Sequence, residues 1–292
     1  MYHEFYAFDI LPFENTPNPR LFFASEQHRE ALAAIEYTIR MRKGIVLVTG
    51  DIGAGKTTVC RTLMERCNDT AQIVQIMHGN ESGAELVRHI LRTLEVPIGR
   101  RDDHPRMLQR LRSYLMEQMR CGRPVVLCVD EAQTLSDAAL EELRLLTNID
   151  TAEEKLIQIA LIGQPELRER IGHPRMAALR QRIVMARRLR PMNRQETAAY
   201  VNHRIRAAST NPDDVQVTFT DQALDAIYDA SGGIPRLTNV ICDNCLLLGY
   251  VREMRQIVPA IVRRVTDDMV PHFGGHAMKE MERPRLSLAG NF

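Results

Sequence analysis

A glycine-rich segment carries the most specific chemistry in the chain. The apolar run Val46–Thr49 leads into the pattern G-x-x-x-x-G-K-[ST] at residues 50–57. A loop of this spacing turns successive backbone N–H groups inward around phosphate oxygens, and a helix that begins at Lys56 adds its positive end. Lys56 can then reach the β- and γ-phosphates of a nucleotide, and the Thr57 hydroxyl can bind Mg²⁺. The segment predicts nucleotide binding by Gly50, Asp51, Ile52, Gly53, Ala54, Gly55, Lys56, Thr57 and Thr58.

Two adjacent carboxylates indicate what happens to the nucleotide. The apolar run Val125–Val129 ends in Asp130 and Glu131. Such a pair costs desolvation free energy at the end of a buried strand unless a cation lies there, and a helix-capping acid would explain only one of the two. We expect Asp130 to hold Mg²⁺, directly or through water, and Glu131 to polarise the attacking water. The pair therefore predicts hydrolysis.

The same run continues through Ala132 and Gln133 as D-E-A-Q, a pattern that is also typical of a helicase box. A helicase would need a second nucleotide-handling domain with motifs of its own. The rest of the chain is too short to supply one, so we do not assign helicase activity.

Two polar residues follow at positions suited to sensing the nucleotide. Gln164 comes directly after the apolar run Leu156–Gly163, which would put its amide beside the γ-phosphate, although a turn-forming glutamine before Pro165 explains it too. Arg236 follows Gly-Gly-Ile-Pro and would lie on the first turn of a helix, where it could be an ordinary surface charge, although a Gly-Gly-x-Pro-Arg helix start is an unusual way to display one.

The stretch from Gly172 to Gln195 contains many arginines and no acidic residue. A solvated basic face is one explanation. Another is that one arginine reaches the γ-phosphate of a neighbouring subunit, a contact worth roughly 10³–10⁵ in rate where it operates. A third is that these arginines bind the phosphates of DNA.

Bulk composition narrows the class of protein. The 292 residues carry a formal net charge of +1 and are 45% hydrophobic, so no global field attracts the chain to nucleic acid or to an anionic membrane. No run approaches the ~18 consecutive apolar residues of a membrane span, and the N-terminus does not resemble a signal peptide. We expect a soluble cytoplasmic protein.

Apolar runs of five to seven residues alternate with helical patterns, which predicts a parallel sheet covered on both faces. Residues after Pro191 show only helical patterns, beginning with the capping box Asn193–Glu196 and continuing at about 221–230, 235–250 and 257–268, with no convincing strand. The expected strands are Ile45–Thr49, Gln72–Met77, Pro124–Val129, Ile157–Ile162 and Ile183–Leu189, and the expected helices start at Ser25 and cover Lys56–Cys67, Gly83–Leu94, Pro105–Arg120 and Ser136–Leu146.

These elements predict an α/β fold: a three-layer αβα P-loop NTPase with a parallel sheet, followed by a small all-helical domain. Four segments are expected. Residues 1–24 form an extended arm packed on a domain, 25–190 the nucleotide-binding domain, 191–269 a small helical domain, and 270–292 a disordered tail.

Taken together, the motifs resemble those of AAA+ ATPases. The resemblance implies a Walker A motif at Gly50–Thr57, a Walker B motif at Val125–Glu131, sensor 1 at Gln164 and sensor 2 at Arg236. It also implies an arginine finger, best placed at Arg182 in Arg-Gln-Arg-Ile, with Arg180 as the second choice.

More narrowly, residues 1–268 resemble the general secretion pathway protein A (ExeA) family. The resemblance is carried by Met1-Tyr2-x-x-Phe5-Tyr6, by Pro12-Phe13-x-x-Thr16-Pro17-x-Pro19-Arg20, by Ser25-x-x-His28-x-x-Ala31-Leu32, by Asp130–Gln133, by Gly163–Leu167 and by Gly232–Arg236.

That family implies ATP with Mg²⁺, a nucleotide site closed by the N-terminal arm and the helical lid, and action as a homo-oligomer on secretin placement or pilus biogenesis. Full-length secretion members continue into a membrane helix and a peptidoglycan-binding region. This sequence carries neither up to Phe292, so we expect a short form recruited to the inner membrane face by a partner. Short relatives also resemble ATPases that select target DNA for transposons. Duplex DNA is therefore an alternative partner, and an ATP-dependent scaffold with little turnover is a second alternative.

Overall fold

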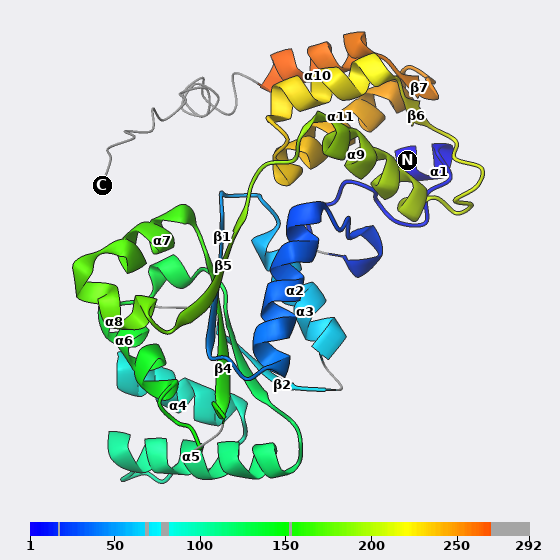
Figure 1. The fold of residues 1–292 in the computed structure, drawn as a ribbon. Helices are drawn as coiled ribbons and strands as arrows, with labels where there is room; N and C mark the ends of the chain where they lie inside the picture. Colours follow the sequence, from blue (N-terminus) through cyan, green and yellow to red (C-terminus); the bar gives the residue numbers. More distant parts are fainter. Residues whose placement is uncertain (17, 68–69, 77–81, 152–153, 270–292) are drawn as a thin grey trace. The chain divides into compact units, whose positions relative to one another are not determined.

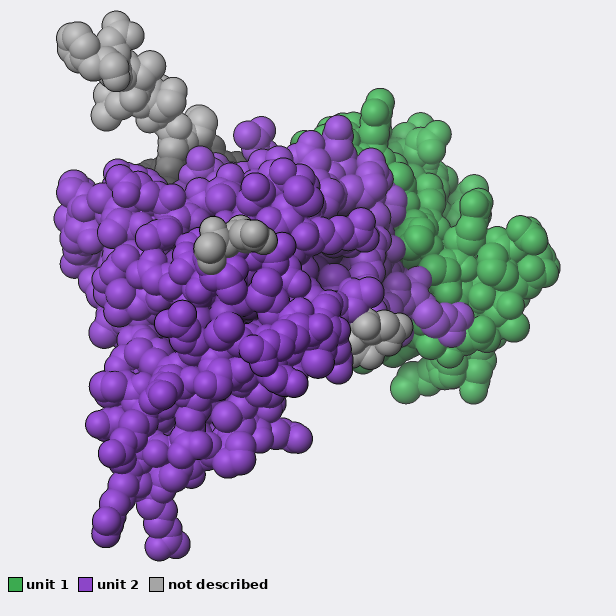
Figure 2. All heavy atoms as spheres, turned by 60° about the horizontal axis from the view of Figure 1, so that its bottom comes forward, with its two compact units in different colours: residues 1–16, 192–292 green, residues 17–191 purple. Residues whose placement is uncertain are grey.

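The computed structural model describes residues 1–16, 18–67, 70–76, 82–151 and 154–269. They form two compact units, which are described separately below and are coloured separately in Figure 2. The larger unit covers residues 17–191, and the smaller unit combines residues 1–16 with the chain from Met192 onward. The expected tail, 270–292, lies outside the described residues.

A five-stranded parallel sheet forms the centre of the larger unit, with the strand order β2-β3-β4-β1-β5 (Figure 1). Every residue of β1, β3 and β4 is buried, as expected of strands that are covered on both faces. All five expected strands are therefore present, although Met77 lies outside the described residues. The strands are β1 (Ile45–Gly50), β2 (Gln72–Ile76), β3 (Val125–Val129), β4 (Ile157–Gly163) and β5 (Ile183–Leu189).

Helices cover both faces of this sheet and make three layers (Figure 1). Side chains alternate across the sheet, so that Leu127 packs into one hydrophobic cluster and Cys128 into the other. On the Cys128 side lie α2 (Glu26–Arg40) and α3 (Lys56–Cys67). On the Leu127 side lie α4 (Gly83–Thr93), α5 (His104–Arg120), α6 (Asp137–Leu146), α7 (Pro165–Gly172) and α8 (Ala177–Arg180), together with the short 3₁₀ turns Ala132–Thr134 and Pro174–Met176.

The smaller unit is mainly helical. Asn193 and Glu196 form the expected capping box at the start of α9, each side chain bonding the other residue's backbone N–H. The expectation of no strand is wrong at one place, because β6 (Thr218–Phe219) pairs in parallel with β7 (Gln256–Ile257). Two-residue strands give too little alternation to be seen in the sequence. The helices are α1 (Tyr2–Phe5), α9 (Arg194–Ala208), α10 (Asp221–Ser231), α11 (Pro235–Val251) and residues 259–269.

The first sixteen residues belong to this helical unit. The hydroxyl of Tyr2 donates to Asp243 Oδ1 at 2.5 Å, and that of Tyr6 donates to the carbonyl of Met254 at 2.9 Å. Arg204 donates to the carbonyls of Pro12 and Glu14 at 2.5 and 3.0 Å. Residues 1–24 therefore divide between the two units, since 18–24 lie in the larger one. That the N-terminal arm closes the nucleotide site stays a prediction.

In the described parts of the chain, no helix is both long enough and apolar enough to cross a membrane.

Candidate active site

The loop between β1 and α3 has the backbone of a phosphate cradle. Gly53 and Gly55 have φ values of 80° and 88°, a region that glycine adopts without strain. Gly50, at the end of β1, lies so close to β5 that an added Cβ would be 2.9 Å from the Cβ of Leu189. Glycine therefore stands where the backbone of this loop adopts positive φ and where β1 approaches β5 most closely.

Lys56 is buried with its ammonium group inside this loop. Its side chain is 5% exposed, and Nζ donates to the carbonyls of Gly50 and Asp51 at 2.9 and 3.0 Å. Burial lowers the pKa of Lys56 from its ordinary value, and the carboxylates of Glu131 and Asp130 oppose that shift. A partly desolvated cation on a loop rich in backbone N–H groups favours an anionic ligand.

Thr57 and Asp130 bring a hydroxyl oxygen and a carboxylate together. Thr57 lies at the start of α3, and Asp130 directly follows β3. The Thr57 hydroxyl donates to Asp130 Oδ2 at 3.0 Å. Asp130 is 7% exposed, and its Oδ1 accepts from the backbone N–H of Glu131 at 2.9 Å. A hydroxyl and a carboxylate fit Mg²⁺, which binds hard oxygen ligands and takes the rest from water and substrate phosphates.

The Glu131 carboxylate is held between two amides. Its Oε2 accepts from Gln133 Nε2 at 2.5 Å and from Gln164 Nε2 at 3.3 Å. Burial alone would raise the pKa of Glu131, but these two hydrogen bonds and the charge of Lys56 outweigh it, and the pKa lies below its ordinary value. Glu131 is therefore ionised at neutral pH. Its backbone adopts φ 52°, which is uncommon for a residue with a side chain.

The sheet register explains why these groups meet. Thr49 of β1 pairs with Gly163 of β4, and Val129 of β3 pairs with Leu161. The carboxyl ends of the three strands therefore lie at one edge of the sheet, where ligands of open α/β sheets bind. The glycine-rich loop, the two acids and Gln164 all follow these ends directly.

Gln133 is the residue that the sequence analysis missed. Its side chain contacts Glu131, and its Oε1 accepts from the backbone N–H of Gln164 at 3.0 Å. The available signal was a glutamine two residues after the second acid, which we considered only as part of a helicase box.

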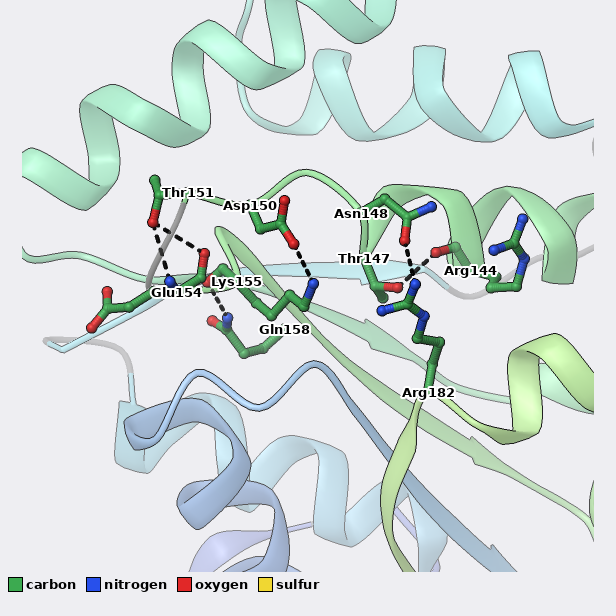
Figure 3. Close-up of polar contacts among 9 residues, drawn as sticks. All are labelled: Arg144, Thr147, Asn148, Asp150, Thr151, Glu154, Lys155, Gln158 and Arg182. Carbon is green, nitrogen blue, oxygen red and sulfur yellow. Dashed lines mark hydrogen bonds and ion pairs between the residues drawn. The ribbon is translucent and has the colours of Figure 1, made fainter.

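Arg182 lies at the other end of the strands, at the amino end of β5. It directly precedes β5, whose first residue pairs with Ile45 and whose last, Leu189, pairs with Gly50. Arg182 and the glycine-rich loop therefore lie at opposite ends of β1. At about 3.3 Å per residue, they are roughly 20 Å apart. Figure 3 shows the Arg182 guanidinium beside Asn148, to whose Oδ1 it donates at 2.8 Å. Arg180 donates instead to the carbonyl of Gly172 at 2.7 Å.

Arg236 belongs to the smaller unit, exposed on the first turn of α11. The glycines before it make the tight connection from α10: Gly232 and Gly233 have φ values of 57° and 72°. A Cβ on Gly233 would lie 1.9 Å from the carbonyl oxygen of Met192, so only glycine fits. This turn therefore fixes where α11 begins and, with it, the position of Arg236.

The arginine-rich stretch is partly neutralised by acids from other segments. Arg175 lies 3.3 Å from Asp137, and Arg188 lies 3.9 Å from Asp51. Arg194 bonds two aspartates of α10, Asp225 at 2.7 Å and Asp229 at 2.6 Å. Although residues 172–195 contain no acid, several of their arginines are therefore paired with acids from elsewhere in the chain.

Comparisons with known proteins show the family of the chain. A family model described as an AAA domain matches residues 39–171. General secretion pathway protein A of Aeromonas hydrophila is 38% identical over 258 residues, which cover 88% of this chain and 46% of that protein. The chain thus spans about half the length of this curated relative.

Solved structures share the fold at low identity. Cdc6p from Pyrobaculum aerophilum superposes with a TM-score of 0.68 at 20% identity, covering 94% of this chain and 74% of that one. A chain of Drosophila ORC bound to DNA superposes with a TM-score of 0.61 at 15% identity, covering 94% and 67%. The motifs, the fold and the curated relative together show that this chain belongs to the AAA+ P-loop ATPases related to general secretion pathway protein A.

Proposed function

We propose that the protein binds ATP with Mg²⁺ and hydrolyses it. The observation that carries the proposal is the convergence of Lys56, of the Thr57–Asp130 pair and of Glu131 at one edge of the sheet. An acid that is ionised at neutral pH and held by two amides is suited to orienting and polarising a water molecule.

Each residue then has one task. The backbone N–H groups of the glycine-rich loop and Lys56 bind the phosphates, while Thr57 and Asp130 are the residues that would hold Mg²⁺. The bound ion supplies charge neutralisation to the phosphate oxygens. Glu131 orients the attacking water, and the amide of Gln164 lies beside it as a sensor of the γ-phosphate. Arg236 is proposed as a second sensor on the helical unit.

The place of Arg182 favours action as an oligomer. An arginine roughly 20 Å from the loop of its own chain cannot touch its own γ-phosphate. Its side chain is partly exposed, so it can contribute to the site of a neighbouring copy. We therefore propose a homo-oligomer in which Arg182 is the finger in trans, with Arg180 as the second choice.

The relation to general secretion pathway protein A supports a role in assembling a secretion or pilus-type envelope system. We place the protein in the cytoplasm, where a protein partner recruits it to the inner membrane face. The helical unit, with residues 1–16 attached to it, is proposed as the lid of the nucleotide site.

A DNA-dependent ATPase is the second candidate, because DNA is bound in the ORC structure that shares this fold. The pairing of Arg175, Arg188 and Arg194 with acids makes the arginine-rich stretch a weaker argument for it. A scaffold with little turnover is the third candidate, and the geometry around Glu131 argues against it.

One experiment separates the three candidates. ATP turnover per subunit is measured against protein concentration, with and without duplex DNA. Turnover that rises with concentration and ignores DNA supports the oligomer with protein partners. Stimulation by DNA supports the second candidate, and tight ATP binding without turnover at any concentration supports the scaffold.

A further inference from the structure

The side-chain amide of Gln133 makes two hydrogen bonds, one through its NH₂ group and one through its carbonyl oxygen. Nε2 donates to Glu131 Oε2 at 2.5 Å, and Oε1 accepts from the backbone N–H of Gln164 at 3.0 Å. Gln133 thus joins the acid that follows β3 to the first residue after β4.

The orientation of this amide is determined by its partners. A backbone N–H can only donate, so the group that faces Gln164 must be the carbonyl oxygen of Gln133. Its NH₂ group then faces Glu131, which as a carboxylate can only accept. Neither bond survives a flip of the amide, and a hydrogen bond to an ionised group is stronger than a neutral one.

Close packing holds Gln133 in this position. A Cβ on Gly163 would lie 2.8 Å from Gln133 Oε1 and 3.3 Å from its backbone nitrogen, so glycine there makes room for the amide. The turn Ala132–Thr134 is also anchored from α7, because Arg170 donates to the carbonyls of Gln133 and Leu135 at 2.7 and 3.0 Å. Thr134 Oγ1 donates to the carbonyl of Glu131 at 2.8 Å.

We propose that Gln133 is a positioning residue that holds the Glu131 carboxylate in place and couples its orientation to the backbone of Gln164. The inference rests on the proposed hydrolysis and adds a role for Gln133 that the motifs do not assign. A shift of the backbone at the end of β4 would act on Glu131 through this amide, in addition to the direct hydrogen bond from Gln164 Nε2 to Glu131 Oε2.

Two variants separate the two ends of the amide. Gln133→Met keeps the approximate volume and removes both hydrogen bonds, whereas Gln133→Glu keeps an acceptor for Gln164 and removes the donor to Glu131. Gln109→Met, on the exposed face of α5, is the matched control. For each variant, ATP turnover at saturation, ADP affinity, thermal unfolding and the amide hydrogen exchange of Gln164 are measured, the last by NMR on nucleotide-free protein.

Both Gln133 variants are expected to lose about tenfold or more in turnover, which corresponds to one oriented hydrogen bond to a charged group, with ADP affinity close to wild type. Only Gln133→Met is expected to accelerate the exchange of the Gln164 amide. The control changes neither property.

Wild-type turnover in Gln133→Met, or equal exchange in the two variants, would overturn the inference. Losses of ADP affinity and thermal stability that parallel the loss of turnover would also overturn it, because they indicate a merely structural role. If the wild-type protein itself hydrolyses no ATP, the proposed function fails, and the exchange of Gln164 still tests whether Gln133 is bonded to it.

Discussion

The imidazole of His28 lies directly against Gly55 of the phosphate-binding loop. A β-carbon on Gly55 would be 2.6 Å from His28 Nε2, a distance that real Cβ atoms do not show. The other ring nitrogen, Nδ1, is 2.6 Å from the hydroxyl of Ser25, which caps α2. His28 is 7% exposed and is also packed edge-on against Phe22. The start of α2 therefore limits the space available to the loop.

This contact predicts that Gly55→Ala loses nucleotide affinity for two reasons. Alanine is strained at φ 88°, by about 1–2 kcal/mol, and its Cβ also collides with His28. In the double variant Gly55→Ala/His28→Ala the collision is gone and only the strain remains, so ADP affinity should recover in part. A double-mutant cycle of ADP dissociation constants measures the coupling, and additive effects would show that the contact does not matter. His89→Ala, on α4 of the same unit, is the control.

Lys56→Ala should abolish tight ATP binding. The variant removes a partly desolvated ammonium group whose charge-assisted hydrogen bonds to phosphate are worth about 1.5–3 kcal/mol each, or at least about tenfold in affinity. ATP titration by calorimetry measures the loss, with the exposed Lys43→Ala as the matched control. Retained micromolar affinity would refute the assignment of the loop.

Glu131→Gln should bind ATP but fail to hydrolyse it, so that ATP stays on the protein. The neutral amide cannot act as a base towards water, and general-base catalysis contributes typically 10²–10⁴-fold in rate. Retention of labelled ATP on the protein over time, together with phosphate release, measures this trapped state. Glu141→Gln, at an exposed ion pair with Arg144, should behave like the wild type. Unchanged turnover in Glu131→Gln would remove Glu131 from the mechanism.

Arg182→Ala should lose turnover while it keeps ATP affinity, because its side chain is far from the loop of its own chain. Mixing Arg182→Ala with Lys56→Ala should restore part of the activity, since a mixed interface combines an intact loop with an intact arginine. Turnover of the mixture against each variant alone is the measurement, and Arg175→Ala serves as the surface control. The absence of any recovery would favour Arg180 or a role within one chain.

Gly233→Ala should destabilise the helical unit strongly. Gly233 and Gly122 have nearly equal φ values, 72° and 70°, but a Cβ on Gly122 would contact nothing within 4 Å. Gly122→Ala should therefore cost only the strain of a positive φ, about 1–2 kcal/mol. Gly233→Ala adds a collision with the Met192 carbonyl, worth about 1–3 kcal/mol more. Thermal or urea unfolding compares the pair, and equal losses would show that the turn can relax.

The sequence by itself was sufficient for the parts of this protein that depend on local patterns. Buried strands appear as unbroken apolar runs, and the phosphate-binding loop needs glycine at fixed spacing because its backbone turns through positive φ. The sequence also shows that Asp130, Glu131 and Gln164 follow strands directly, and parallel strands bring their carboxyl ends together, but the roles of these residues stay predictions. The capping box of α9 is equally local.

Tertiary structure decided the contacts that join distant segments. No pattern in the sequence shows that Gln133 bonds the backbone of Gln164, or that His28 limits the space at Gly55, since each pair meets only after the sheet and its helices have packed. The division of the N-terminal segment between the two units was likewise decided by distant residues: Asp243 holds Tyr2 across 241 residues, and Arg204 holds Pro12 across 192. Spacing along a chain predicts a backbone conformation, whereas the partner of a side chain depends on which surfaces the whole fold brings together.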